Sequence, residues 1–105
     1  MPGKFDDLYK RTPIRALEGQ AGILQTILFL EKVGEVNFQK IVGDAGITGR
    51  SLYGSLEKLG KLGLIKQRTD STSYPPKNMI TLTEKGKKIA IKLKEVEIVL
   101  RDENE

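Results

Sequence analysis

The apolar residues of the chain fall into helical spacing in successive stretches. From about Gln20 to Val33 they recur every three or four positions, which predicts one face of an amphipathic helix that ends at Gly34. A second helix is predicted from Phe38 to Ala45. A third begins at Thr48, whose hydroxyl can cap it, and runs to about Leu62. The inward residues predicted for the first and third helices are Ile23, Leu24, Ile27, Leu28, Leu30, Leu52, Leu56, Leu59 and Leu62.

Two runs with strand character follow. Residues 64–69 and 79–83 flank a segment, 70–78, that is rich in turn formers and includes Pro75 and Pro76. The pattern predicts a β-hairpin with a long tip. Val36 and Phe38 indicate a further strand of two or three residues before the second helix.

A last helix is predicted from Glu84 to Glu103, capped by Thr83. Its apolar residues follow heptad spacing, four, three and four residues apart, and they are Ile89, Leu93, Val96 and Leu100. Such a helix is about 30 Å long, more than so small a domain can cover. The stripe can fold back on the domain, but we expect it to form a homodimer interface, since an exposed stripe favours aggregation.

The predicted fold class is therefore mainly α with a small β-hairpin (α+β), and 105 residues suit a single core. We divide the chain into an N-terminal arm (1–19), a central domain (20–83) and a C-terminal dimerisation helix (84–105). Thr12 and Pro13 resemble a helix start, but Gly19 and Gly22 predict a break soon after.

The segment from Phe38 to Leu59 fits a helix-turn-helix. Gly46 stands where the turn needs a positive φ, and Ile41, Ala45, Ile47 and Leu52 stand where the two helices must pack. A helical hairpin with a glycine turn is not specific by itself, because many proteins contain one.

Two further motifs narrow the class. The run from Leu59 to Ile65, with Gly63-Leu64-Ile65, and the run Leu82-Thr83-Glu84-Lys85-Gly86 resemble the winged helix-turn-helix transcriptional regulators of bacteria and archaea, in the broad MarR, PadR and ArsR-like group. The resemblance covers about residues 20–90. It implies a recognition helix (48–62) in the major groove of double-stranded DNA and a wing (70–78) on the backbone or minor groove.

The residue types agree with that role. Arg50 suits a bidentate contact to guanine, while Ser51 and Tyr53 can reach base edges or phosphates. Gly54 permits close approach to DNA or is simply a tolerated glycine. The complete predicted DNA-binding set is Thr48, Arg50, Ser51, Tyr53, Gly54, Ser55, Lys58, Lys61, Lys66, Arg68 and Lys77, the lysines and Arg68 serving as phosphate anchors. Val42, Gly49 and Gly54 depart from the family pattern, which predicts weak sequence-specific reading of DNA.

Charge is unevenly distributed along the chain. Residues 1–47 are neutral, residues 48–94 hold eleven basic and three acidic residues for a net +8, and residues 95–105 carry −4. The basic segment begins at the predicted recognition helix, which favours a polyanionic partner.

The absence of His and Cys removes the usual ligands of zinc and haem and the common nucleophile and base pairs. We predict no enzyme activity, no cofactor and no small-molecule substrate. No apolar run is long enough for a membrane helix and the N-terminus lacks a secretory pattern, so we expect a cytoplasmic, nucleoid-associated protein that does not engage membranes.

Two other functions stay open from the sequence. One is an architectural or partition protein that coats DNA with low sequence specificity. The other is a winged helix used only as a protein-interaction module.

Overall fold

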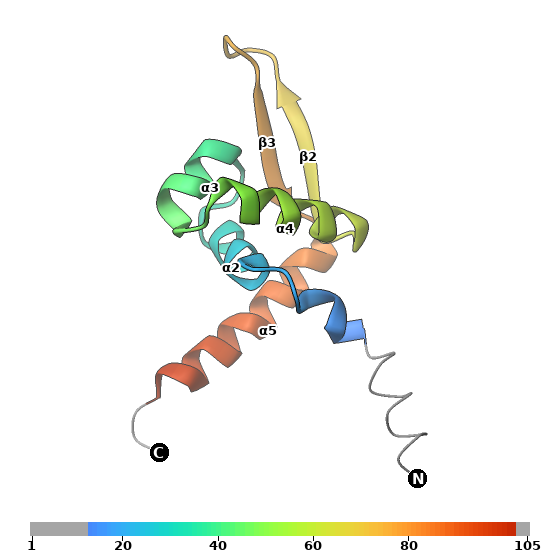
Figure 1. Cartoon of the computed structure of the whole chain (residues 1–105), viewed down its shortest axis with the longest axis vertical. Coiled ribbons are helices and arrows are strands. Elements are labelled where there is room, and N and C mark those ends of the chain that lie inside the picture. Colours follow the sequence, from blue (N-terminus) through green and yellow to red (C-terminus); the bar gives the residue numbers. More distant parts are fainter. Residues whose placement is uncertain (1–12, 103–105) are drawn as a thin grey trace.

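The structure is a computed structural model that describes residues 13–102, and those residues form five helices and three strands (Figure 1). The elements are η1 (Pro13–Leu17, a 3₁₀ helix), α2 (Ile23–Val33), β1 (Val36–Asn37), α3 (Phe38–Ala45), α4 (Gly49–Lys61), β2 (Ile65–Asp70), β3 (Lys77–Leu82) and α5 (Glu84–Arg101). The predicted α+β class is confirmed. None of these helices is long and apolar enough to cross a bilayer.

Side-chain caps begin three of the helices. The Thr48 hydroxyl accepts a hydrogen bond from the Ser51 amide at 3.1 Å, and the Thr83 hydroxyl accepts one from Gly86 at 3.0 Å. Both predicted caps are confirmed. The Asn37 carboxamide oxygen caps α3 by accepting from the Lys40 amide at 2.9 Å, a cap that the sequence analysis did not identify.

Glycines set the ends of the helices. Gly34 and Gly46 follow α2 and α3 with φ values of 83° and 71°, as predicted. The helix predicted from about Gln20 instead begins at Ile23, because Gly22 takes the left-handed conformation at φ 84° and breaks the helical path. The predicted break after η1 is thereby confirmed, whereas most of the arm, residues 1–12, lies outside the described part of the chain.

The three strands form an antiparallel sheet in the order β1-β3-β2. The pairing of β2 with β3 runs from Ile65↔Leu82 out to Asp70↔Lys77. The predicted wing, 70–78, was therefore too long, since Asp70, Lys77 and Asn78 belong to strands and the turn is confined to residues 71–76. These polar residues resemble a loop in sequence, but cross-strand pairs such as Asp70 with Lys77 extend the ladder into solvent.

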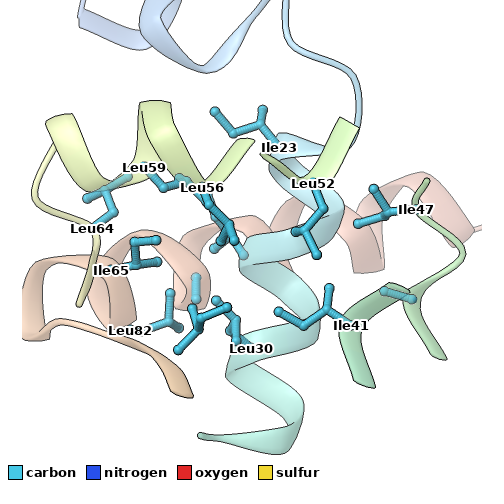
Figure 2. Close-up of a cluster of buried hydrophobic side chains, with 14 residues drawn as sticks. Ile23, Leu30, Ile41, Ile47, Leu52, Leu56, Leu59, Leu64, Ile65 and Leu82 are labelled. Carbon is cyan, nitrogen blue, oxygen red and sulfur yellow. The ribbon is translucent and has the colours of Figure 1, made fainter. Parts of the chain in front are cut away.

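The core forms around α2, which contacts α3, α4, α5 and β3. Buried apolar side chains from α2, α3, α4, α5 and the strands β2 and β3 meet there, as Figure 2 shows. Its fully buried apolar members include Ile27, Leu30, Ile41, Leu52, Leu59 and Ile80. Leu24, predicted on the inward face, is 42% exposed, because the register that buries Ile23 and Ile27 turns it outward.

The two halves of α5 have different surroundings. Gly86 and Ala90 are buried, and a Cβ atom at Gly86 would overlap the carbonyl oxygen of Leu64. The helix thus packs its first turns closely against the domain. Its C-terminal half runs away from the rest of the domain (Figure 1), and Val96 and Leu100 are 53% and 75% exposed.

Candidate nucleic-acid interface

One face of α4 is buried and the other is polar. Leu52, Leu56 and Leu59 point into the core, while Arg50, Tyr53, Glu57 and Lys61 are exposed on the outside. The left-handed Gly46 turns the chain between α3 and α4. This arrangement confirms the predicted helix-turn-helix and leaves the N-terminal end of α4 accessible.

Tyr53 is held in place by a neighbouring ring. Its ring centroid lies 4.6 Å from that of Phe38, at an interplanar angle of 39°. Tilted aromatic pairs at this separation are attractive. Phe38 therefore orients Tyr53 on the exposed face of α4.

A second side of α4 is covered by the segment that precedes α2. The Gln20 side chain donates to the Ser51 carbonyl oxygen at 3.2 Å and lies against Gly54, where a Cβ atom would overlap its amide group. The Ser55 hydroxyl donates to the Ala21 carbonyl at 3.1 Å and is fully buried. The predicted DNA contact by Ser55 is therefore corrected, while at Gly54 the flexible end of the Gln20 side chain lies over the position that a Cβ atom would take.

Lys58 lies on this covered side as well. Its ammonium group is 3.4 Å from the Glu18 carbonyl oxygen, and the residue is half-buried. Lys58 is therefore a weaker candidate for a DNA contact than Lys61. Lys61 is exposed, and its ammonium group lies 3.9 Å from a Glu57 carboxylate oxygen, which makes a loose ion pair.

The hairpin carries cations along its outer face. Lys66 and Arg68 alternate with Gln67 and are exposed on β2, and Lys77 begins β3. Within residues 13–102, Arg50, Lys66 and Lys77 form no ion pair. These three cations are therefore available to a polyanion.

Arg68 already has a carboxylate partner. Its Nε and Nη2 atoms donate to the two oxygens of Glu35 at 2.8 Å and 2.6 Å. This bidentate pair holds the pKa of Glu35 below its usual range and raises the pKa of Arg68. Arg68 keeps further N–H donors, but a phosphate must compete with Glu35 for the guanidinium.

The tip of the hairpin presents an aromatic residue that the sequence analysis missed. Tyr74 is 99% exposed between Ser73 and Pro75. Asp70 orders this turn by accepting from the amide and hydroxyl of Thr72, and those hydrogen bonds hold the pKa of Asp70 below its usual range. An aromatic residue beside two prolines in a turn was the available signal, since it cannot reach the core from there.

The recognition helix and the hairpin lie next to each other. β2 contacts α4 at the base of the hairpin, and the strands project beyond α4 on the side opposite to the free end of α5 (Figure 1). Arg50 and Lys61 on the helix and Lys66 and Lys77 on the hairpin are thus parts of adjacent elements. We call the exposed faces of α4 and the β2–β3 hairpin the basic face.

A separate apolar groove of about 390 Å³ lies between η1, the end of α4 and α5. The sequence gives no indication of this groove, because its walls come from segments far apart in the chain. The groove is lined by Pro13, Ile14, Leu17, Leu62, Leu64, Lys85, Ile89, Lys92, Leu93 and Val96. Among the residues from 13 to 102, no group of His, Cys, Asp or Glu side chains could hold a metal ion.

A helix-turn-helix followed by an antiparallel sheet with a projecting hairpin defines the winged helix-turn-helix class. The chain belongs to the family of ArnR1-like winged-helix domains, whose model matches residues 15–100. The resemblance to winged-helix regulators that the motifs indicated is thereby confirmed.

Solved structures show the same fold at low identity. A MarR-family protein from Porphyromonas gingivalis W83 is 22% identical with a TM-score of 0.72, over 89% of each chain. A transcriptional regulator homologue from Pyrococcus horikoshii OT3 is 22% identical with a TM-score of 0.68, over 92% of this chain and 99% of the other. FabT from Streptococcus pneumoniae, solved in complex with DNA, is 17% identical with a TM-score of 0.67, over 94% of this chain and 72% of the other. No curated protein matches the chain.

Proposed function

We propose that this protein is a DNA-binding transcriptional regulator that presents the basic face to double-stranded DNA. The observation that carries the proposal is the pairing of a polar, accessible recognition helix with an adjacent cationic hairpin. The fold relative FabT, solved with DNA, supports this role. The proposed activity is binding without catalysis, at chromosomal DNA in the cytoplasm.

We propose the following roles for the predicted DNA-binding residues of α4 and the hairpin. Arg50, the second residue of α4, is placed to read a guanine, and Tyr53 and Ser51 lie near it in the first turns of the helix. Thr48 caps α4 and its backbone lies at the helix N-terminus, where phosphates are favoured. Lys61, Lys66 and Lys77 are the proposed phosphate anchors. Arg68 is a secondary anchor because it is paired with Glu35, and Lys58 is another because it lies against the Glu18 carbonyl at the edge of the face.

We propose that the protein acts as a homodimer through the C-terminal half of α5, because two linked basic faces would bind DNA with greater avidity than one. Val96 and Leu100 are exposed there, and an exposed apolar surface of this kind is typical of a protein–protein interface. Two linked basic faces suit two half-sites about 34 Å apart, one turn of DNA.

The test is the affinity for duplex DNA of Arg50→Ala combined with Lys66→Ala. Both groups are exposed and form no ion pair with the other described residues, so we expect the affinity to fall by at least about tenfold with no loss of stability. Lys32→Ala is the matched control, because it removes an exposed cation from α2, outside the basic face. Unchanged affinity in the double variant would favour a protein-interaction module and contradict the proposal.

A second candidate is an architectural protein that coats DNA with little sequence preference. The composition of α4 favours it, because Gly49 and Gly54 offer no side chain and Glu57 adds a negative charge to the exposed face. Selection of bound duplexes from a random pool separates the two. An enriched palindromic motif supports the regulator, and equal retention of all sequences supports the coating protein.

A further inference from the structure

We infer that Gln20, in the segment before α2, is a specificity-determining residue for the DNA that α4 contacts. Its carboxamide oxygen is placed to accept a hydrogen bond from the exocyclic amino group of an adenine or a cytosine in the major groove. The inference rests on the proposed DNA binding by the basic face. It adds a base-reading group that α4 itself lacks.

The segment from residue 18 to residue 21 is fastened along one side of α4. At one end, the Lys58 ammonium group lies 3.4 Å from the Glu18 carbonyl oxygen. At the other end, the fully buried Ser55 hydroxyl donates to the Ala21 carbonyl oxygen at 3.1 Å. The backbone around Gln20 therefore has a fixed place beside the recognition helix.

Two glycines shape the chain on either side of this contact. Gly19 and Gly22 take left-handed conformations, with φ values of 81° and 84°. Residues with a Cβ atom rarely adopt such angles. The turns at these two glycines bring the short piece between them against α4, with the Gln20 side chain directed at the helix.

Backbone carbonyl groups hold the Gln20 carboxamide. Its Nε2 atom donates to the Ser51 carbonyl oxygen at 3.2 Å and to the Ala21 carbonyl oxygen at 3.3 Å. Both N–H groups of the amide are thereby used. The Oε1 atom accepts no hydrogen bond from any residue between 13 and 102. A side chain already held through its donors loses little conformational entropy when its oxygen binds a partner.

The free oxygen lies over Gly54 at the edge of the outer face of α4. An ideal Cβ atom at position 54 would be 2.5 Å from Oε1 and 2.6 Å from Nε2 of Gln20, so the carboxamide takes the place of a side chain there. Position 54 comes one turn after Arg50 and one turn before Glu57, which are both exposed. Gln20 is only half-buried, so it supplies a polar group to this face where α4 has none.

An acceptor oxygen selects among the base edges of the major groove. Adenine presents its N6 amino group there and cytosine its N4 amino group, whereas guanine and thymine present carbonyl oxygens. The Gln20 oxygen therefore favours adenine or cytosine over the other two bases. Arg50 carries only donors and favours guanine, so the two residues discriminate in opposite senses.

The test is the selection of bound duplexes from a random pool by the wild-type protein, Gln20→Met and Gln20→Ala. Methionine keeps the length and the packing over Gly54 but has no carboxamide oxygen. We expect the wild-type protein to enrich adenine or cytosine at one position, and both variants to lose that preference while the other positions keep theirs. Affinity for the selected duplex should fall about fivefold, the value of one hydrogen bond, and affinity for mixed-sequence duplex should not change. The enriched base itself distinguishes adenine from cytosine.

Gln25→Met is the matched control. The Gln25 side chain also donates from α2 to a backbone carbonyl of the helix-turn-helix, that of Ala45 at 3.4 Å, so its loss should leave the base preference unchanged. Gly54→Ala pushes the flexible Gln20 carboxamide aside and should remove the preference at the same position as Gln20→Met. A purely stabilising role of Gln20 would not alter which base is preferred.

The outcomes separate this inference from the proposed function. If the wild-type protein selects a motif and the Gln20 variants select the same one, the inference is overturned and the regulator stands. A uniform loss of affinity for all sequences in the Gln20 variants would also overturn it. If the wild-type protein enriches no base at any position, base reading by Gln20 and the sequence-specific regulator both fail.

Discussion

The helices α4 and α5 are both amphipathic, but they differ in which residues they leave exposed to solvent. Both carry a Leu- or Ile-rich stripe, and both begin at a threonine cap. The stripe of α4 is buried within its own domain, so its free face is polar and includes Arg50 and Lys61. The stripe of α5 outruns the domain, and Val96 and Leu100 remain exposed.

This difference separates two kinds of recognition in one small protein. A polar face with unpaired cations fits a polyanion and does not need to be covered. An exposed apolar stripe gains free energy only when another apolar surface covers it. We therefore assign α4 and the hairpin to DNA and the second half of α5 to a second copy of the chain.

The largest effect is expected where α5 is anchored. Gly86→Ala places a Cβ atom against the Leu64 carbonyl oxygen, a backbone group that cannot move aside cheaply. We expect the free energy of unfolding to fall by about 3 kcal/mol, measured by urea denaturation. Gly60→Ala, in α4 with open space around it, should instead gain about 0.5 to 1 kcal/mol. Equal stabilities of the two variants would show that α5 is not closely packed at Gly86.

The free half of α5 is tested by Val96→Glu combined with Leu100→Glu. Two carboxylates on the exposed stripe oppose its burial, so the dissociation constant of the dimer should rise at least about 100-fold. Affinity for a two-site duplex should fall with it, because the avidity of two linked faces is lost. Ile98→Glu, on the opposite side of the helix, should leave the dimer intact. Light scattering across a concentration series reads the result, and a dimer that persists in the double variant contradicts the assignment.

On the DNA-facing side of the molecule, the tip of the hairpin is tested by replacing Tyr74. A fully exposed aromatic ring at the end of a cationic wing is suited to pack in the minor groove. Tyr74→Ala should weaken DNA binding about tenfold, and Tyr74→Phe should retain most of the affinity. Fluorescence anisotropy with a labelled duplex measures both. If Phe is as weak as Ala, the hydroxyl group rather than the ring makes the contact.

The smallest effect concerns the Glu35–Arg68 pair. Because Arg68 holds the pKa of Glu35 below its usual range, the carboxylate is ionised and the pair is intact from about pH 5 to 8. It breaks only as the pH falls through that lowered pKa, so its contribution to stability is lost on acidification. Glu35→Gln frees Arg68 for phosphate and should tighten DNA binding about threefold. Glu31→Gln removes the same charge from a pair with Lys94 on α5 and should not change it.

The fold was predictable where local chemistry decides it. Thr48 and Thr83 as caps, and Gly34 and Gly46 as stops, act through neighbouring backbone groups, so their roles follow from the residues around them. The extension of the hairpin was not predictable, because strand pairing between residues such as Asp70 and Lys77 outweighs their loop-like composition.

The site was predictable only in outline. Ser55 looked like a DNA contact because it shares α4 with Arg50, yet its hydroxyl donates to the Ala21 carbonyl, 34 residues earlier in the chain. Arg68 looked like a free anchor until Glu35 was brought beside it by the sheet. Contacts of this kind depend on tertiary packing, which residue spacing along the chain does not reveal.

The central claim, that the basic face binds the DNA backbone, is tested most directly by a salt series with mixed-sequence duplex DNA. If about four cations contact phosphates, affinity should fall roughly 100-fold between about 50 and 200 mM salt. The Arg50→Ala and Lys66→Ala double variant should give a shallower slope, and Lys32→Ala an unchanged one. A wild-type affinity that is independent of salt would contradict the account.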